Sequence, residues 1–157
     1  YLGLRDWEHK SFHGHELSTY NGSSYNSYLI KDEKTVLVDT VWNLHSDIFM
    51  DILDTEVGID NIDYIVINHA EPDHSGSLGR IMERRPDLPI YCSVKGADII
   101  RKHFHKDWNF RKVKTGDTLS IGQCELVFVD MTMIHWPDSM MTFAKGPNVL
   151  FSNDAFG

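Results

Sequence analysis

Residues 64–78, with the sequence YIVINHAEPDHSGSL, place a short apolar strand directly before a cluster of ionisable side chains. The strand character ends at Asn68, and four ionisable residues follow within six positions: His69, Glu71, Asp73 and His74. Carboxylates this close together repel each other unless a positive charge lies between them. One bound cation, or a pair of cations, supplies that charge. The stretch therefore predicts a metal site at the end of a strand, which ligands from elsewhere in the chain would complete.

The rest of the chain alternates between segments with strand character and segments with helix character. Apolar spacing closed by Gly58 predicts one helix, and Pro86 ends another. The expected helices cover residues 45–57, 75–85 and 94–104. The expected strands cover residues 27–30, 35–39, 62–68, 88–93, 113–114, 118–121, 125–130, 141–145 and 148–153, whereas residues 1–20 show no clear period. Hairpins at both ends with βα units between them predict an α/β layered fold with a mixed sheet, in one domain over residues 1–157.

The composition is that of an ordinary soluble globular protein. The chain has 157 residues, of which 41% are hydrophobic and 24% charged, enough to bury a core. Its net charge of −8, without a cluster of Lys and Arg, argues against a nucleic-acid partner. No apolar run is long enough for a membrane helix and no signal-peptide pattern is present, so a cytoplasmic location is expected. Cys92 and Cys124 are expected to be buried thiols rather than a disulfide.

A polar loop that caps a helix is the competing interpretation of the ionisable cluster. In that case Asp73 or Ser75 would serve as the N-cap. Capping requires only one such residue, whereas the cluster contains four, so a metal site is the preferred interpretation. In a loop that leaves a strand, side chains two positions apart converge while the next pair points to a second centre. Two metals a few ångströms apart are therefore compatible with the spacing.

Two further candidate ligands follow other expected strands. His135 stands in the loop MTMIHWPDS, and Asp154 comes after the strand over residues 148–153. Taken alone, each has an ordinary explanation, as a packed or surface histidine and as a turn or cap residue. However, His69, His135 and Asp154 all fall just beyond the carboxyl end of a strand, where α/β sheets place their ligands. Three segments that bring ligands to one sheet edge make a stronger prediction than any one of them.

These motifs together resemble a known family. The run HAEPDH, then His135, then Asp154 nineteen residues later, is similar to the metallo-β-lactamase fold in the form used by flavodiiron proteins. That family includes flavorubredoxin-type nitric oxide reductases and oxygen reductases. The stretches RDWE, FHG, GSSYNSYLI, HWPDSMMT and LFSNDAFG support the resemblance, which runs along essentially the whole chain. It implies a metallo-β-lactamase-like αβ/βα sandwich, of which this chain would form the N-terminal part.

The resemblance implies a ligand set for two iron ions. The ligands would be His69, Glu71 and His135 for one iron, Asp73 and His74 for the other, and Asp154 as a bridge between them. In some family members the residue that matches His74 is not bound directly. The hydrolases of the superfamily carry a histidine at the position of Glu71. A third imidazole suits zinc, whereas a carboxylate oxygen is a hard anionic donor that stabilises ferric iron.

Two more residues take roles from the same resemblance. His13 resembles the family's histidine near the diiron pocket, which donates a hydrogen bond to bound substrate; a surface histidine in an irregular segment is the alternative. Trp136 resembles the aromatic residue that lies near the flavin, and packing alone would also explain it.

By this resemblance, the parent protein would reduce nitric oxide to nitrous oxide, or dioxygen to water, at a non-haem diiron centre. Electrons would pass through FMN of a neighbouring subunit in a homodimer or homotetramer, supplied by a rubredoxin-type donor. The family adds one more histidine ligand well beyond Asp154 and a flavodoxin-like domain with FMN, and this chain contains neither. The isolated chain is therefore expected to bind iron weakly or incompletely and to show little turnover.

Two other functions stay open from the sequence. A diiron sensor or binding module without a flavodoxin domain would signal oxygen through the state of its irons. A zinc hydrolase would use the same fold. The metal content after anaerobic purification separates iron from zinc, and the downstream coding sequence separates the enzyme from the sensor. These residues do not decide between nitric oxide and dioxygen.

Overall fold

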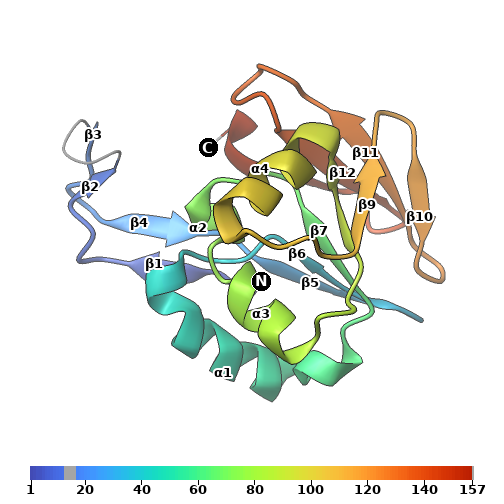
Figure 1. The fold of residues 1–157 in the computed structure, drawn as a ribbon, viewed down its shortest axis with the longest axis horizontal. Helices are drawn as coiled ribbons and strands as arrows, with labels where there is room; N and C mark the ends of the chain where they lie inside the picture. The colour runs from blue at the N-terminus through green and yellow to red at the C-terminus, as the bar shows by residue number, and fades with distance from the viewer. Residues whose placement is uncertain (13–16, 157) are drawn as a thin grey trace.

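A five-stranded mixed sheet forms the centre of the computed structural model, which describes residues 1–12 and 17–156 (Figure 1). In spatial order its strands are β5 (Tyr28–Lys31), β6 (Thr35–Val38), β7 (Tyr64–Ile67), β8 (Ile90–Ser93) and β9 (Phe110–Val113). Strand β5 is antiparallel to β6, and the other neighbouring pairs are parallel. The expected hairpin and mixed sheet are confirmed. The carboxyl ends of the parallel strands therefore meet at one edge of the sheet.

The central strands are apolar throughout because both faces of the sheet are covered. In β6, Val36 and Val38 face a second sheet, whereas Leu37 faces the helices. In β7, Val66 lies on the side of the second sheet and Ile65 on the side of the helices. All five side chains are 0% exposed. Because side chains alternate along a strand, successive residues pack into two separate cores, one under the helices and one between the two sheets.

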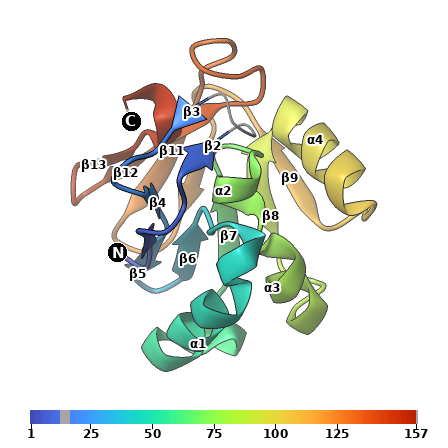
Figure 2. The same cartoon turned by 90° about the vertical axis from the view of Figure 1, so that its left-hand side faces the viewer.

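Three helices cover one face of the central sheet (Figure 2). They are α1 (Ser46–Glu56), α3 (Leu78–Arg84) and α4 (Val94–Phe104), and two 3₁₀ helices, η1 (Asn43–His45) and η2 (Ile59–Asn61), flank α1. Helix α4 has the bounds that its apolar spacing predicts. It begins where Ser93 Oγ accepts a hydrogen bond from the Gly96 N–H at 2.9 Å, and it ends at His105, whose φ is +53°.

An antiparallel sheet covers the opposite face of the central sheet (Figure 2). Its strands are β10 (Thr118–Ser120), β11 (Glu125–Asp130), β12 (Met140–Lys145) and β13 (Val149–Phe151), and the 3₁₀ helix η3 (Asn153–Ala155) follows. Leu126, Phe128 and Ala144 fill the space between the two sheets. The chain thus forms a helix layer and two sheet layers, which confirms the α/β fold class. Strand β9 covers residues 110–113 rather than 113–114, because it pairs along the whole of β8.

Residues 1–25 contain short strands that the sequence, which shows no clear period over residues 1–20, does not indicate. The strands are β1 (Leu4–Asp6), β2 (Ser11–Phe12), β3 (Leu17–Ser18) and β4 (Ser23–Tyr25). Strand β1 pairs with β4 in the register Leu4 to Tyr25. Strands of two or three residues are too short to show a period. The Asp6 carboxylate fixes this segment by accepting from the Tyr25 hydroxyl at 3.0 Å and lying 2.8 Å from His45 Nε2.

The expected helix over residues 75–85 is present as α3 but begins later, at Leu78, and a separate helical turn that the sequence does not indicate, α2 (Pro72–Ser75), precedes it. Pro72 lies in the first turn of α2, where a missing N–H has no cost. Gly76 follows α2, and a Cβ at this position would lie 2.6 Å from the backbone N of Asn43. Only glycine permits such a close approach. Asp73 and His74 therefore lie on a helical turn rather than in an open loop.

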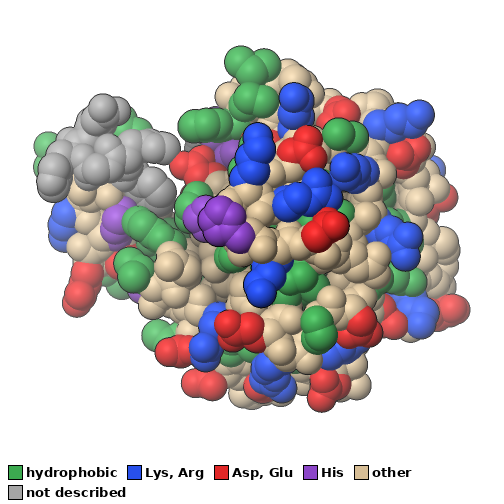
Figure 3. All heavy atoms as spheres, viewed as in Figure 1, with side chains coloured by type: hydrophobic (Ala, Val, Ile, Leu, Met, Phe, Trp, Pro, Cys, Tyr) green, Lys and Arg blue, Asp and Glu red, His purple; other side chains and the backbone are tan. Residues whose placement is uncertain are grey.

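The surface carries charges of both signs. Figure 3 shows basic and acidic side chains interspersed on one face of the molecule. In α4, Arg101 forms ion pairs with Asp98 and Asp107. Cys92 and Cys124 are free and buried, as expected, and burial raises the pKa of the Cys92 thiol to about 12. None of the helices within residues 1–12 and 17–156 has the length and apolar character that a membrane crossing needs.

Candidate metal centre

The end of β7 is fixed at the junction of the two sheets, directly before His69. The Asn68 carbonyl accepts from the Met140 N–H at 2.9 Å, and its side-chain oxygen accepts from the Thr142 hydroxyl at 2.7 Å. The Asp39 carboxylate accepts from the Asn68 N–H at 2.7 Å. His69 itself is only 2% exposed. Bonds with Asp39, which follows β6, and with two residues of β12 therefore hold the backbone from which His69 projects.

The helical turn α2 is tied to the loop after β6. Both the backbone N–H and the hydroxyl of Thr40 donate to the His74 carbonyl, at 2.6 and 2.9 Å. The Ser77 N–H donates to the Val41 carbonyl at 2.9 Å. These bonds fix the orientation of α2 at the carboxyl edge of the central sheet, beside His69.

The capping interpretation of this segment is wrong. The residue that precedes α2 is Glu71, whose side chain makes no capping bond, and the Ser75 hydroxyl donates to the Ala70 carbonyl instead. Asp73 Oδ1 is buried and has no hydrogen-bond partner. A buried carboxylate oxygen without a partner is costly unless a cation satisfies it. The local structure therefore favours a metal over a cap.

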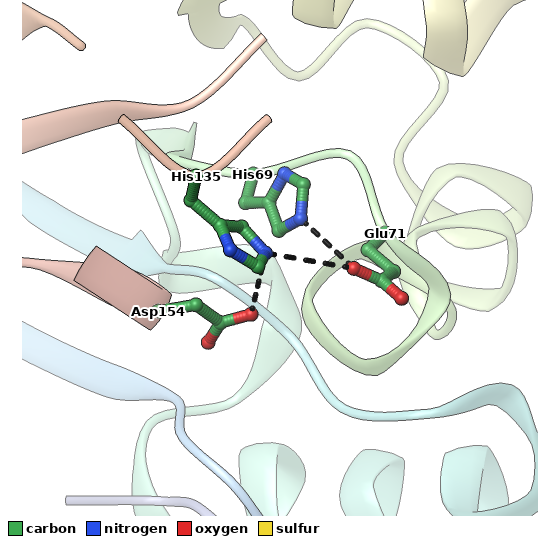
Figure 4. Close-up of side chains that lie close together, drawn as sticks. All are labelled: His69, Glu71, His135 and Asp154. Carbon is green, nitrogen blue, oxygen red and sulfur yellow. Dashed lines mark hydrogen bonds and ion pairs between the residues drawn. The ribbon is translucent and has the colours of Figure 1, made fainter. Parts of the chain in front are cut away.

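Four of the candidate ligands come together in a first group (Figure 4). His69 Nε2 lies 3.1 Å from Glu71 Oε2, and His135 Nε2 lies 3.9 Å from the same oxygen. His135 Nε2 is also 3.3 Å from Asp154 Oδ2. One ligand atom from each residue lies within 4.8 Å of the others. Bonds of about 2.0–2.2 Å to a central ion separate ligand atoms by up to about 4 Å, so the spacing suits one metal.

A second group shares Asp154 with the first. His74 Nε2 lies 2.9 Å from Asp154 Oδ1 and 3.6 Å from Asp73 Oδ2. The two oxygens of Asp154 therefore face different groups, Oδ1 toward His74 and Oδ2 toward His135. The structure thus brings together all six residues that the sequence singles out as ligands, in the two sets that the family resemblance implies.

The charges in the site shift several pKa values. Burial lowers the pKa of His69, but its hydrogen bonds to Asp138 and Glu71 outweigh this and raise the pKa to about 9. Burial likewise opposes protonation of His74, whereas its carboxylate neighbours, Asp154 first, hold its pKa well above the usual value. Burial raises the pKa of Asp73. Without metal, protonated imidazoles supply the positive charge among the carboxylates, and a bound cation would replace those protons.

Two buried aspartates beside the site are absent from the sequence prediction. Asp138 Oδ2 lies 2.9 Å from His69 Nδ1, and Asp39 Oδ2 lies 3.9 Å from His74 Nδ1. A signal for Asp39 exists, because it follows an apolar strand just as Asn68 and His69 follow theirs. Asp138 carries no signal of its own beyond its place in the HWPDS motif with His135.

The two remaining site predictions have different outcomes. His13 lies outside the described residues. Trp136 is 45% exposed, and the centroid of its ring is 6.3 Å from that of His69, beside a cavity of about 290 Å³. The cavity is lined by His69, Ala70, Glu71, Pro72, Ile99, His103, Trp136 and Asp138. A wider cavity of about 760 Å³ lies away from these residues, between β5 and the β12–β13 hairpin. The expected place of Trp136 near a flavin stays a prediction.

Comparison with known proteins agrees with this geometry. The family model described as Metallo-beta-lactamase superfamily matches residues 20–157. The chain belongs to this superfamily. Within it, the chain is 55% identical over its whole length to the anaerobic nitric oxide reductase flavorubredoxin of Salmonella arizonae, and it spans 33% of that protein.

Solved structures place the chain beside flavodiiron proteins of this superfamily. The flavodiiron protein of Giardia intestinalis matches with a TM-score of 0.93 and 34% identity, over 99% of this chain and 38% of that one. The rubredoxin oxygen:oxidoreductase of Desulfovibrio gigas matches with a TM-score of 0.91 and 41% identity, over 99% and 39%. The resemblance to flavodiiron proteins is therefore confirmed along the chain, which spans about a third of the length of the curated relatives it matches.

Proposed function

We propose that this protein is an oxidoreductase that reduces nitric oxide to nitrous oxide, dioxygen to water, or both, at a non-haem diiron site. The observation that carries the proposal is the Asp154 carboxylate, whose two oxygens face two separate groups of ligands. A carboxylate between two ligand sets is suited to a pair of metals a few ångströms apart. Similar proteins named as a nitric oxide reductase and an oxygen oxidoreductase support this reaction class.

The donor set favours iron over zinc. The ligands would be His69, Glu71 and His135 for one iron, Asp73 and His74 for the other, and Asp154 for both. Three carboxylates offset much of the charge of two iron ions, and hard oxygen donors suit the ferric state. The irons, when bound, would supply the electrons for the reduction, while the protein holds the ligands in place.

The two groups differ in their access to solvent. The His135 side chain of the first group is 30% exposed, whereas the His74 side chain of the second group is 5% exposed. We expect a diatomic substrate to approach from the side of His135. The rigid attachment of α2 to the loop after β6 would keep the second group closed during this approach.

The proposal includes further components. FMN would relay electrons, a rubredoxin-type protein would donate them, and the assembly would be a homodimer or homotetramer in the cytoplasm. The names flavorubredoxin and rubredoxin oxygen:oxidoreductase of the similar proteins support the flavin and the donor. An additional histidine ligand for the second iron, and a hydrogen bond from His13 to substrate, complete the proposed site.

The decisive experiment uses the protein expressed from its full reading frame and purified without oxygen. We expect about two iron ions per chain and consumption of nitric oxide or dioxygen when a reduced rubredoxin-type donor is supplied. The matched variant Glu71→His should favour zinc and lose gas consumption, because a third imidazole suits zinc. Zinc alone in the wild-type protein would support a hydrolase and contradict the proposal. Two irons without consumption of either gas would support a sensor instead.

A further inference from the structure

Asp138 lies three residues after His135 and is buried to 2% exposure, although it is not among the ligand groups. Its Oδ2 accepts two hydrogen bonds, from His69 Nδ1 at 2.9 Å and from the Ala70 N–H at 2.7 Å. Its backbone carbonyl accepts a third, from the Ser93 hydroxyl at 2.7 Å. Asp138 therefore connects the loop of His135 to the loop of His69 and to the start of α4.

An ionised carboxylate only accepts hydrogen bonds, so the ring nitrogen that faces Asp138, Nδ1, has to carry a proton. The other ring nitrogen, Nε2, faces Glu71 Oε2 at 3.1 Å in the first group, and a bound metal would replace the proton that Nε2 donates there, which frees its lone pair for the metal. A histidine that binds a metal usually donates its second ring N–H to a carboxylate, which fixes the ring and strengthens the donor nitrogen. The contacts of Asp138 have this arrangement.

We propose that Asp138 is a positioning residue that holds His69 with Nε2 directed at the metal of the first group and thereby makes that group the tighter of the two. The inference rests on the two-metal site of the proposed function. It goes beyond that function by assigning a role to a residue that would touch neither metal nor substrate.

The second group lacks such support. His74 Nδ1 is buried and makes no hydrogen bond, because the nearest carboxylate oxygen, Asp39 Oδ2, lies 3.9 Å away. That oxygen already accepts from the Asn68 side chain at 3.3 Å. Of the two histidines that follow β7, only His69 therefore has its Nδ1 hydrogen-bonded to a carboxylate. We expect the two metals to bind with unequal affinity, and the difference to depend on Asp138.

The experiment measures binding of Zn²⁺, a diamagnetic probe, to the metal-free protein from the full reading frame, in competition with a chelator. Asp138→Ala should weaken one of the two binding steps by about 10- to 100-fold and change the other little. Asp138→Asn keeps an oxygen that accepts both hydrogen bonds, so it should recover most of the affinity. The control Ser139→Ala removes only a bond from the Trp136 N–H to a neighbouring buried hydroxyl and should bind both ions like the wild type.

Nitrogen NMR of the zinc-loaded protein, with labelled histidine, reads the same inference directly. The wild type should show His69 bound through Nε2 with a slowly exchanging Nδ1 proton, which Asp138→Asn keeps and Asp138→Ala loses. A wild-type His69 bound through Nδ1 would overturn the inference even if neither variant folds. So would equal weakening of both binding steps, or no weakening at all, in Asp138→Ala. A wild-type protein that binds no metal would overturn the proposed function as well, which distinguishes the two failures.

Discussion

Raising the pH should destabilise the metal-free protein, because the site then loses protons that its carboxylates stabilise. Burial lowers the pKa of His69, but Asp138 and Glu71 raise it to about 9 from the ordinary 6.5. A histidine whose pKa is raised by folding contributes stability that is complete below its unfolded pKa. That contribution is lost as the pH rises through the folded pKa. The raised pKa of His74 acts in the same direction.

The size of the effect follows from the pKa of His69. Each pKa unit corresponds to about 1.4 kcal/mol, so the rise from 6.5 to about 9 corresponds to about 3 kcal/mol of unfolding free energy. This is a large part of the ~5–15 kcal/mol that stabilises a typical domain. The lowered pKa values of Asp138 and Asp154 contribute stability that is lost only in acid. The decline between pH 6.5 and 9 is therefore expected to come from the histidines.

Urea unfolding in the presence of a chelator, at pH values from 6 to 10, measures this decline. His69→Gln should flatten the dependence on pH, whereas His103→Gln, at an exposed position of α4, should leave it unchanged. Zinc-loaded protein should also show little decline, because the metal replaces the protons. An unfolding free energy that stays constant or rises between pH 6.5 and 9 in metal-free wild-type protein would refute the reasoning.

Three further perturbations test other parts of the structure. Asp154→Asn should weaken both metal-binding steps by about tenfold or more in calorimetric titration, since its two oxygens face both groups, while the exposed Asp87→Asn should have no effect. Ser93→Ala should lower the unfolding free energy by about 1–2 kcal/mol, because it removes the N-cap of α4; an unchanged urea midpoint would contradict this. Phe128→Ala should cost about 3–5 kcal/mol in the same assay, because its ring is 1% exposed and stacks on Tyr91.

Much of the fold could be predicted because its signals are local. The apolar runs of β6 and β7 reflect coverage of both sheet faces, and the spacing in α4 reflects one buried stripe. The N-terminal strands could not be predicted, because the pairing of Leu4 with Tyr25 joins distant segments of two or three residues. The break between α2 and α3 was equally hidden, because it depends on the packing of Gly76 against Asn43.

The sequence by itself determined the chemistry of the site. Glu71, Asp73 and Asp154 provide carboxylates and His69 and His135 provide imidazoles whatever the packing, and the choice of metal depends on those atom types. Only the tertiary structure decided which oxygen of Asp154 faces which group, and which histidine donates its Nδ1 hydrogen bond to a carboxylate. The bond from Asp138 to His69 joins residues 69 positions apart, so it exists only where the second sheet meets the end of β7. Residue types set what a site can bind, whereas long-range packing sets how each ligand is held.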